Sequence, residues 1–293
     1  MSNPTLLLGA QRRVHRLGFG AMRLCGQPGN FGPYPDWEAG KALLRKALEA
    51  GVDFIDTAHA YGPGWNETLI GEVLAETGSN AWVATKGGVE KTAPDKVFPD
   101  GRPAQLRLRC EESLRRLQLE TLPLYQLHRP DPAVPFEESV GALAALQAEG
   151  KILHVGLSNV SVAHIESARA ILPIVSVQNR YNLTERADQP VLEYCRAHAI
   201  AYIPWGPLAA KPFAPEAPLA RETRLESIAR THGATPGQVA LAWLLHTSPN
   251  TLLIPGTTNA QHLAENLAAA RLTLSTEELS ALDALDALKS GSS

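Results

Sequence analysis

The feature that most constrains the fold is a repeated alternation between short apolar runs and longer segments with helical periodicity. The apolar runs are rich in β-branched residues or leucine, whereas the segments between them are rich in Ala, Leu, Glu and Arg. Strands are predicted at 16–21, 52–55, 81–85, 122–127, 152–156, 174–178, 201–204 and 251–254. Helices are predicted at 37–50, 67–76, 104–117, 136–149, 162–171, 190–198, 222–232, 236–246 and 260–270.

The length of the repeat indicates how these elements assemble. Roughly 250 residues divided among eight units give about 30 residues for each strand and its helix, the size of one βαβ step. This favours one closed barrel over two doubly wound domains, and no linker divides the chain. We therefore predict an α/β fold, a (β/α)8 TIM barrel that forms a single domain over residues 1–293.

Both ends of the chain carry additional predicted elements. The runs 5–8 and 12–15, separated by a Gly-Ala pair, predict a β-hairpin that plugs the barrel floor. The segment 272–288 predicts one more helix, with Ser275 as its N-cap and two glutamates in its first turn. The last residues, 290–293, are expected to form a disordered tail.

Charge and cysteine content exclude several classes of protein. The 27 Lys and Arg against 30 Asp and Glu give a net charge of −3, so no basic field attracts nucleic acid or an acidic membrane. Cys25, Cys110 and Cys195 are too scattered to suggest disulfides or a zinc site. No export signal and no run of 18 apolar residues is visible. We expect a cytoplasmic protein with no nucleic-acid or membrane partner, and its oligomeric state is left open.

The usual nucleotide and hydrolase motifs are missing from the sequence. There is no G-x-G-x-x-G, no phosphate-loop motif, no H-E-x-x-H, no G-x-S-x-G and no Tyr four residues before a Lys. A Rossmann dehydrogenase, a zincin, an α/β-hydrolase and a short-chain reductase all become less favoured.

Four reactive side chains follow consecutive predicted strands. Asp56 follows 52–55, with Tyr61 in the next loop, and Lys86 and His128 follow the next two strands. Singly, each has an ordinary alternative: a turn cap, a turn residue, a solvated strand end and a core histidine. Together at the carboxyl ends of barrel strands, where active sites form, they indicate proton-transfer chemistry.

Five segments closely resemble the aldo-keto reductase superfamily, in that family's order. They are FIDTAHAYG at 54–62, VATK at 83–86, LYQLH at 124–128, GLSN at 156–159 and IPGTT at 254–258. The resemblance runs from about residue 17 to residue 270. It implies an NAD(P)H-dependent reductase of aldehydes and ketones with the catalytic tetrad Asp56, Tyr61, Lys86 and His128.

The chemistry expected of this tetrad can be argued physically. Hydride addition to a carbonyl places negative charge on its oxygen, so the site needs a proton donor there. Tyr61 is the candidate general acid, and the adjacent Lys86 ammonium would stabilise its phenolate. Asp56 would hold Lys86 charged, and His128 would be a second donor that orients the substrate.

The resemblance places the nicotinamide end of a cofactor near the later strands. It assigns Ser158, Asn159 and Gln178 to the carboxamide and the ring of Trp205 to the nicotinamide face. For Asn159 or Ser161, a helix cap is the alternative. Further residues expected to contact the cofactor are Gly20, Ala21, Asp56, Gly206, Leu208 and Gly256.

The adenosine end is expected at the start of the last barrel helix. Thr257 and Thr258 precede that helix, whose N-terminus would suit the 2′-phosphate. His262 lies in its first turn, and Glu265 and Asn266 match the family's adenine-contacting pair. Gly256 and His262 stand where many relatives have Lys and Arg. The expected cofactor is therefore NADPH, with its 2′-phosphate bound less tightly than in those relatives, and NADH is expected to bind more weakly still.

The substrate is expected to be a small carbonyl compound. Met22, Arg23 and Arg129 would give the mouth an apolar wall with cationic groups, which favours flat, polar substrates; alternatively, the arginines pair with Asp131 or Glu67. The segments 89–102 and 209–220 do not indicate a deep apolar pocket. Segments at 20–22, 31–33 and 262–266 resemble a bacterial subgroup that includes pyridoxal reductases, so pyridoxal is the first candidate.

Two rival functions fit parts of the pattern. A redox-sensing regulatory subunit of the same fold would turn over slowly and bind a membrane partner, but no docking extension is visible. A barrel lyase or isomerase that uses Lys86 as a Schiff base would leave Tyr61, His128 and Trp205 unexplained.

Overall fold

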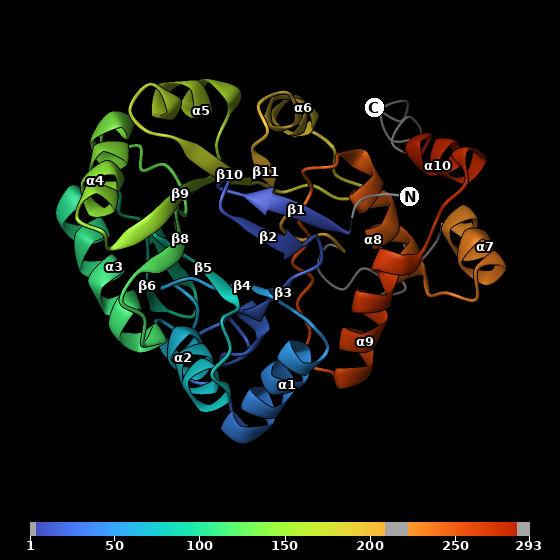
Figure 1. The fold of residues 1–293 in the computed structure, drawn as a ribbon, viewed down its shortest axis with the longest axis horizontal. Helices are drawn as coiled ribbons and strands as arrows, with labels where there is room; N and C mark the ends of the chain where they lie inside the picture. The colour runs from blue at the N-terminus through green and yellow to red at the C-terminus, as the bar shows by residue number, and fades with distance from the viewer. Residues whose placement is uncertain (1–3, 209–221, 286–293) are drawn as a thin grey trace.

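A parallel sheet of seven strands, curved into a barrel and ringed by helices, forms the centre of the molecule (Figure 1). The computed structural model describes residues 4–208 and 222–285. The strands lie in the order β11-β10-β9-β8-β5-β4-β3, and every neighbouring pair is parallel. In chain order they are β3 (Phe19–Gly20), β4 (Phe54–Asp56), β5 (Trp82–Gly87), β8 (Leu122–Leu127), β9 (Ile152–Ser158), β10 (Ile174–Gln178) and β11 (Ala201–Tyr202).

The segment 251–254, predicted as the eighth strand, closes the barrel through isolated bridges. Leu253 pairs with Leu17 at one edge of the sheet, and Thr251 pairs with Tyr202 at the other. The (β/α)8 barrel is confirmed, but the prediction of a full eighth strand is wrong. Prolines explain why β11 and the segment 251–254 are short. Pro204 and Pro255 follow these two segments and lack the N–H group that a strand ladder requires.

Ten α-helices are found in the described part of the chain, close to the predicted ranges, and most of them surround the barrel (Figure 1). They are α1 (Trp37–Glu49), α2 (Trp65–Thr77), α3 (Pro103–Leu117), α4 (Phe136–Ala148), α5 (Val162–Arg169), α6 (Gln189–Ala197), α7 (Thr223–Thr231), α8 (Pro236–Thr247), α9 (Ala260–Ala268) and α10 (Thr276–Asp283). None of the described helices is long and apolar enough to cross a membrane.

The strands alternate between two apolar cores, as strand geometry requires. Ile55 and Val83 point outward into the core shared with the helices. Phe54 and Ala84 point inward, into a second core that also contains Leu8 of the N-terminal hairpin. This hairpin, β1 (Thr5–Leu8) and β2 (Arg12–His15), forms as predicted and closes the barrel floor.

Two details at the periphery differ from the prediction. The hairpin of β6 (Val89–Ala93) and β7 (Lys96–Pro99) was not expected, because Lys, Glu and Pro are poor strand formers; Pro94 and Asp95 at its turn were the available signal. Helix α10 begins at the Ser275 capping box as predicted but ends at Asp283. The end of its predicted range and the expected tail at 290–293 lie outside the described residues.

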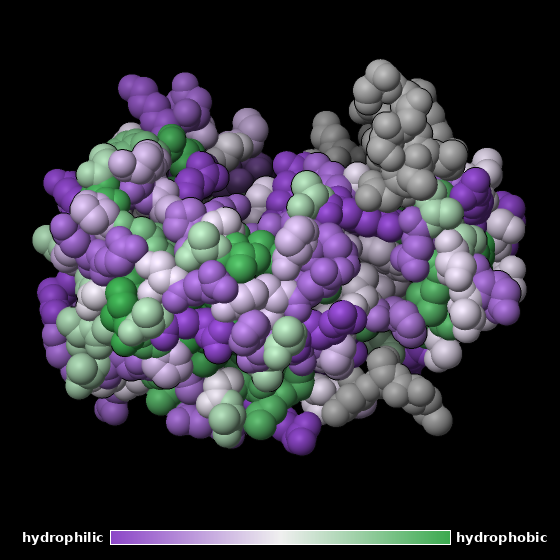
Figure 2. Space-filling view, turned by 90° about the horizontal axis from the view of Figure 1, so that it is seen from above, coloured by the Kyte–Doolittle hydropathy of each residue, from purple (hydrophilic) through white to green (hydrophobic). Residues whose placement is uncertain are grey.

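One side of the molecule is covered mainly by polar residues, with apolar residues in small groups among them (Figure 2). Such scattered apolar groups are normal for a protein surface. The described residues on this side of the molecule therefore show no extended apolar surface, and the candidate functional residues lie at the ends of the strands.

Candidate active site

Three neighbouring strands bring the four candidate catalytic residues together. Asp56 is the last residue of β4, Lys86 lies near the end of β5, and His128 directly follows β8. Strands β4, β5 and β8 are consecutive in the sheet, so their carboxyl ends meet at one edge. Tyr61 reaches the same place from the loop between β4 and α2.

Lys86 is the centre of the hydrogen-bond network at this edge. Its Nζ lies 2.7 Å from Asp56 Oδ1, 2.8 Å from the carbonyl oxygen of Thr57 and 3.5 Å from the Tyr61 hydroxyl. Lys86 is fully buried and Asp56 is almost so. Burial alone would lower the pKa of Lys86, but the charge and hydrogen bond of Asp56, together with Tyr61, outweigh it, so the net pKa is raised and Lys86 is an ammonium.

Tyr61 is protonated at neutral pH in this environment. Burial raises its pKa, the Lys86 cation opposes this effect, and Asp56 adds to it, so the net pKa lies above 10. Lys86 therefore favours the phenolate as the sequence predicts, without bringing its pKa below the ordinary value. Tyr61 is poised to donate a proton rather than to accept one.

The imidazole of His128 is neutral and has an unused polar atom. Its ring lies edge-on to that of Tyr61, with centroids 5.9 Å apart. Burial, together with the positive charges of Lys86 and Arg129, lowers its pKa well below 6.5. Its Nδ1 is buried and has no hydrogen-bond partner within the described part of the chain. Such atoms are uncommon in proteins. The residue also lines the cavity that opens above it, so the exposed part of its ring can contact a bound molecule.

A cavity of about 430 Å³ opens above these residues. Most of the predicted site residues line it: Gly20, Met22, Arg23, Asp56, Tyr61, His128, Arg129, Ser158, Asn159, Gln178, Trp205, Gly206, Leu208 and Gly256. Lys86 lies beneath it and acts through its neighbours. The predicted residues that do not line it are Ala21, which is buried, and Thr257, Thr258, His262, Glu265 and Asn266.

The sequence analysis did not assign four residues that line the cavity: Arg180, Pro207, Ile254 and Pro255. Arg180 follows β10 by two residues, so the strand-end rule that selected the tetrad could have found it. Its guanidinium lies 5.2 Å from the centre of the Trp205 ring and is paired with Glu185 at 2.7 Å.

The polar groups at the nicotinamide end predicted from the sequence are bound to one another. Asn159 accepts a hydrogen bond from Trp205 Nε1 at 3.1 Å and donates to Ser158 Oγ at 3.0 Å. Gln178 Nε2 donates to Asp56 Oδ2 at 2.7 Å. The cap of α5 is Ser161, which accepts from the backbone of His164, so the cap alternative is wrong for Asn159.

The start of α9 is capped by the chain itself. The Asn259 side chain accepts hydrogen bonds from the backbone N–H groups of Gln261 and His262, at 2.7 and 3.2 Å. Two of the free N–H groups expected for a phosphate are therefore already paired. Thr257 is buried and its hydroxyl accepts from the backbone N–H of Asn259, while Thr258 and His262 are exposed.

The alternative in which Arg23 and Arg129 pair with Asp131 or Glu67 is not found among the described residues. Glu67 is fully buried and pairs with Arg116 at 2.8 Å. The carboxylate of Asp131 accepts hydrogen bonds from the backbone N–H groups of Gly101 and Ala133. Neither carboxylate is bonded to Arg23 or Arg129.

A cluster of ionic residues lies behind the Tyr61 loop. Arg116 joins Glu67 to His59, whose Nδ1 is 3.0 Å away, and Arg109 binds Glu90 through two hydrogen bonds of 2.8 and 2.7 Å. The backbone N–H of His59 donates to the carbonyl oxygen of Lys86 at 3.1 Å. The cluster therefore ties the Tyr61 loop to β5. No group of three metal-ligating side chains is found in 4–208 and 222–285.

Comparison with known proteins places the chain among oxidoreductases. The model of the aldo/keto reductase family matches residues 16–287. The chain is 43% identical over 270 residues to an uncharacterized oxidoreductase of Schizosaccharomyces pombe, covering 92% of this chain and 86% of the relative. It is 41% identical over 292 residues to pyridoxine 4-dehydrogenase of Escherichia coli, covering 97% and 99%. The crystal structure of an aldo-keto reductase from Klebsiella pneumoniae in complex with NADPH superimposes with a TM-score of 0.81 at 29% identity, covering 97% and 95%.

Proposed function

The chain belongs to the aldo/keto reductase family, and from this membership we propose that it is an NADPH-dependent oxidoreductase that reduces aldehydes and ketones to alcohols. One observation carries the proposal: Lys86 Nζ lies between Asp56 and the protonated Tyr61 hydroxyl, at 2.7 and 3.5 Å, at the base of the cavity. A proton donor with a fixed cation behind it suits a reaction that places negative charge on an oxygen.

The residues around the cavity fit a nicotinamide cofactor. His128 and the half-buried ring of Trp205 both line the cavity, and they offer a polar ring and a flat apolar face to bound molecules. NADPH supplies a hydride when it is bound. Ser158, Asn159 and Gln178 would hold its carboxamide and Trp205 its ring. Gly20, Ala21, Gly206, Leu208 and Gly256 would contact it further along, and Thr257, Thr258, His262, Glu265 and Asn266 its adenosine end.

The chain's own residues then manage the proton. The substrate oxygen lies between Tyr61 and His128, whose neutral imidazole donates a hydrogen bond and orients the carbonyl. As negative charge develops on that oxygen, Tyr61 transfers its hydroxyl proton to it, which gives the alcohol and a phenolate. Lys86 stabilises the phenolate, Asp56 keeps Lys86 charged, and Tyr61 then regains a proton from solvent.

The geometry argues against the rival use of Lys86 as a Schiff-base nucleophile. An attacking lysine must be a neutral amine, which usually requires a lowered pKa. The pKa of Lys86 is instead raised by Asp56. Lys86 is also fully buried, beneath the cavity rather than in its wall.

Small aromatic aldehydes of the pyridoxal type are the proposed substrates. The cavity of about 430 Å³ is in the lower part of the usual range for ligand sites. The E. coli relative is named pyridoxine 4-dehydrogenase, and pyridoxine is a small compound with a single aromatic ring.

The test is a panel of carbonyl compounds followed at the NADPH absorbance band. We expect pyridoxal and benzaldehyde to be reduced with a higher kcat/KM than a steroid ketone, and NADPH to quench tryptophan fluorescence. A steroid ketone with a tenfold higher kcat/KM would contradict the substrate class. NADPH binding without turnover of any carbonyl compound would contradict the proposal that the protein is a carbonyl reductase, and it would favour the alternative of a redox-sensing regulatory subunit.

A second arm compares the two cofactors. We expect NADPH to be preferred over NADH mainly through KM, because the 2′-phosphate is remote from the reacting atoms and its contacts act on ground and transition states alike. His262→Ala should narrow the preference. Equal KM values in the wild type would show that the start of α9 does not bind the phosphate.

A further inference from the structure

The lining of the cavity is rich in positive charge. Three arginines line it from the ends of different strands: Arg23 after β3, Arg129 after β8 and Arg180 after β10. Asp56 is the only acidic side chain among its described lining residues, and Lys86 neutralises that carboxylate at 2.7 Å. The described lining therefore carries a net positive charge.

Only one of the three arginines has a structural partner. Arg180 is bound to Glu185 and stacked on Trp205. Arg23 and Arg129 are exposed, and neither forms an ion pair with any residue in 4–208 or 222–285. Two unpaired cations at one mouth repel each other, so they do not stabilise the described fold. Both side chains are free to bind a ligand.

We propose that the natural substrate carries an anionic group, a carboxylate or a phosphate monoester, and that Arg23 and Arg129 bind this group at the cavity mouth while the carbonyl lies at Tyr61 and His128. This inference rests on the proposed carbonyl reduction and names the substrate class for the same site. Guanidinium groups suit both anions, because their planar donors match carboxylate and phosphate oxygens.

Arg129 lies beside one of the two residues proposed to bind the carbonyl. Arg129 is the next residue after His128, and consecutive Cα atoms are about 3.8 Å apart. The positive charge of Arg129 is also close enough to contribute, after burial and Lys86, to the lowered pKa of His128. His128 and Arg129 both line the cavity, so one bound molecule can contact the two residues.

A matched pair of aldehydes tests the proposal. 4-Carboxybenzaldehyde and methyl 4-formylbenzoate share the ring and the aldehyde and differ in charge. The ester is the more electrophilic aldehyde, so chemistry alone favours the ester. We expect the wild type to prefer the carboxylate by about tenfold or more in kcat/KM, mainly through KM, because a hydrogen bond to a charged group is stronger than one to a neutral group. Added salt should reduce the preference, since exposed charges are screened.

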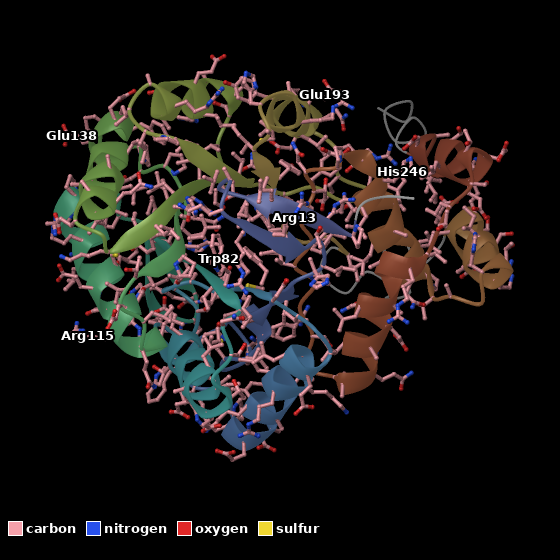
Figure 3. All side chains as sticks on the ribbon, viewed as in Figure 1. Arg13, Trp82, Arg115, Glu138, Glu193 and His246 are labelled. Atoms are coloured by element: carbon pink, nitrogen blue, oxygen red, sulfur yellow. The ribbon has the colours of Figure 1, made fainter. Side chains whose placement is uncertain are left out.

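Variants assign the preference to particular residues. Arg23→Gln and Arg129→Gln should each reduce the preference, and the double variant should abolish it while methyl 4-formylbenzoate is still reduced. Arg13→Gln is the control for net charge, because Arg13 is exposed on the hairpin at the barrel floor (Figure 3). Pyridoxal and pyridoxal 5′-phosphate form a second matched pair for phosphate. The anion whose pair shows the larger preference in kcat/KM is the preferred one.

The outcomes separate this inference from the function on which it rests. Equal use of the two benzaldehydes by the wild type, or a preference that survives in the double variant, would overturn the anion site and leave carbonyl reduction intact. A double variant that loses NADPH binding, measured by tryptophan fluorescence, but keeps its aldehyde preference would assign the arginines to the cofactor and also overturn it. No turnover of any aldehyde by the wild type would overturn the proposed function itself.

Discussion

The ammonium nitrogen of Lys86 lies 3.5 Å from the hydroxyl oxygen of Tyr61 and 5.1 Å from the centre of its ring. The cation is therefore directed at the oxygen that would lose its proton. In a buried site this arrangement stabilises the phenolate more than the phenol, so Lys86 sets how readily Tyr61 releases a proton.

Replacing Lys86 should shift the pH dependence of both reaction directions. In Lys86→Met the pKa of Tyr61 rises further, because the group that opposes the effect of burial is gone. Reduction needs the phenol, so the fall of its kcat at alkaline pH should move to higher pH. Alcohol oxidation needs the phenolate, so the rise of its kcat with pH should also move to higher pH, and its kcat at neutral pH should fall. kcat measured against pH in both directions checks this. Lys46→Met, at an exposed position of α1, is the control, and unchanged profiles in Lys86→Met would refute the coupling.

The ion pair of Glu90 and Arg109 should make stability depend on pH. Burial would raise the pKa of Glu90, but two hydrogen bonds from Arg109 and the nearby His59, whose Nε2 is 3.8 Å away, outweigh it and lower the pKa to about 2. A depressed carboxyl pKa stabilises the fold above the unfolded value of 4.5, and this contribution is lost as the pH falls toward 2.

Arg109→Met should therefore lower the free energy of unfolding by about 2–3 kcal/mol at pH 7, and by less at pH 4 and pH 3. Urea unfolding at the three pH values measures the difference. Arg115→Met is a matched control, because Arg115 is exposed on the same helix, α3 (Figure 3). A loss that does not change with pH would show that Glu90 is not the group involved.

Much of the site could be predicted because strand ends follow from hydrophobic patterning. Asp56, Lys86 and His128 directly follow or end apolar runs, and a closed parallel sheet must bring such positions together. Hydrophobic patterning does not predict the direction of a side chain or how far it is removed from water. The net pKa of Tyr61 and the capping role of Asn259 therefore emerged only from the structure.

The seam of the barrel was predicted less well for a related reason. The run 251–254 has the composition of a strand, yet its pairing depends on how the barrel closes and on neighbouring prolines. Arg16 was predicted as the first residue of a strand. Instead it is buried, and its side chain donates hydrogen bonds to the carbonyl oxygens of Leu245, Ser248 and Thr251, at 2.5, 2.5 and 3.0 Å.

Removal of the Arg16 side chain should open this seam. Arg16→Met leaves buried carbonyl oxygens without their donor, and each such group costs about 1–3 kcal/mol. We expect a loss of at least about 3 kcal/mol in urea unfolding, with kcat retained by the molecules that remain folded. Arg13→Met, which changes an exposed arginine of β2, should leave the midpoint unchanged. A midpoint of the wild-type value in Arg16→Met would show that the backbone bridges alone hold the seam.

The kcat of Tyr61→Phe for benzaldehyde and NADPH at neutral pH tests the central claim most directly, because the substitution keeps the ring and removes only the transferable proton. General acid catalysis contributes about 10²- to 10⁴-fold, so we predict a fall of at least that size. The dissociation constant of NADPH, measured in parallel by tryptophan fluorescence, should stay at its wild-type value. A variant that binds NADPH normally and retains about half of the wild-type kcat would have lost far less activity than removal of a general acid should cost. That result would show that Tyr61 does not supply the proton.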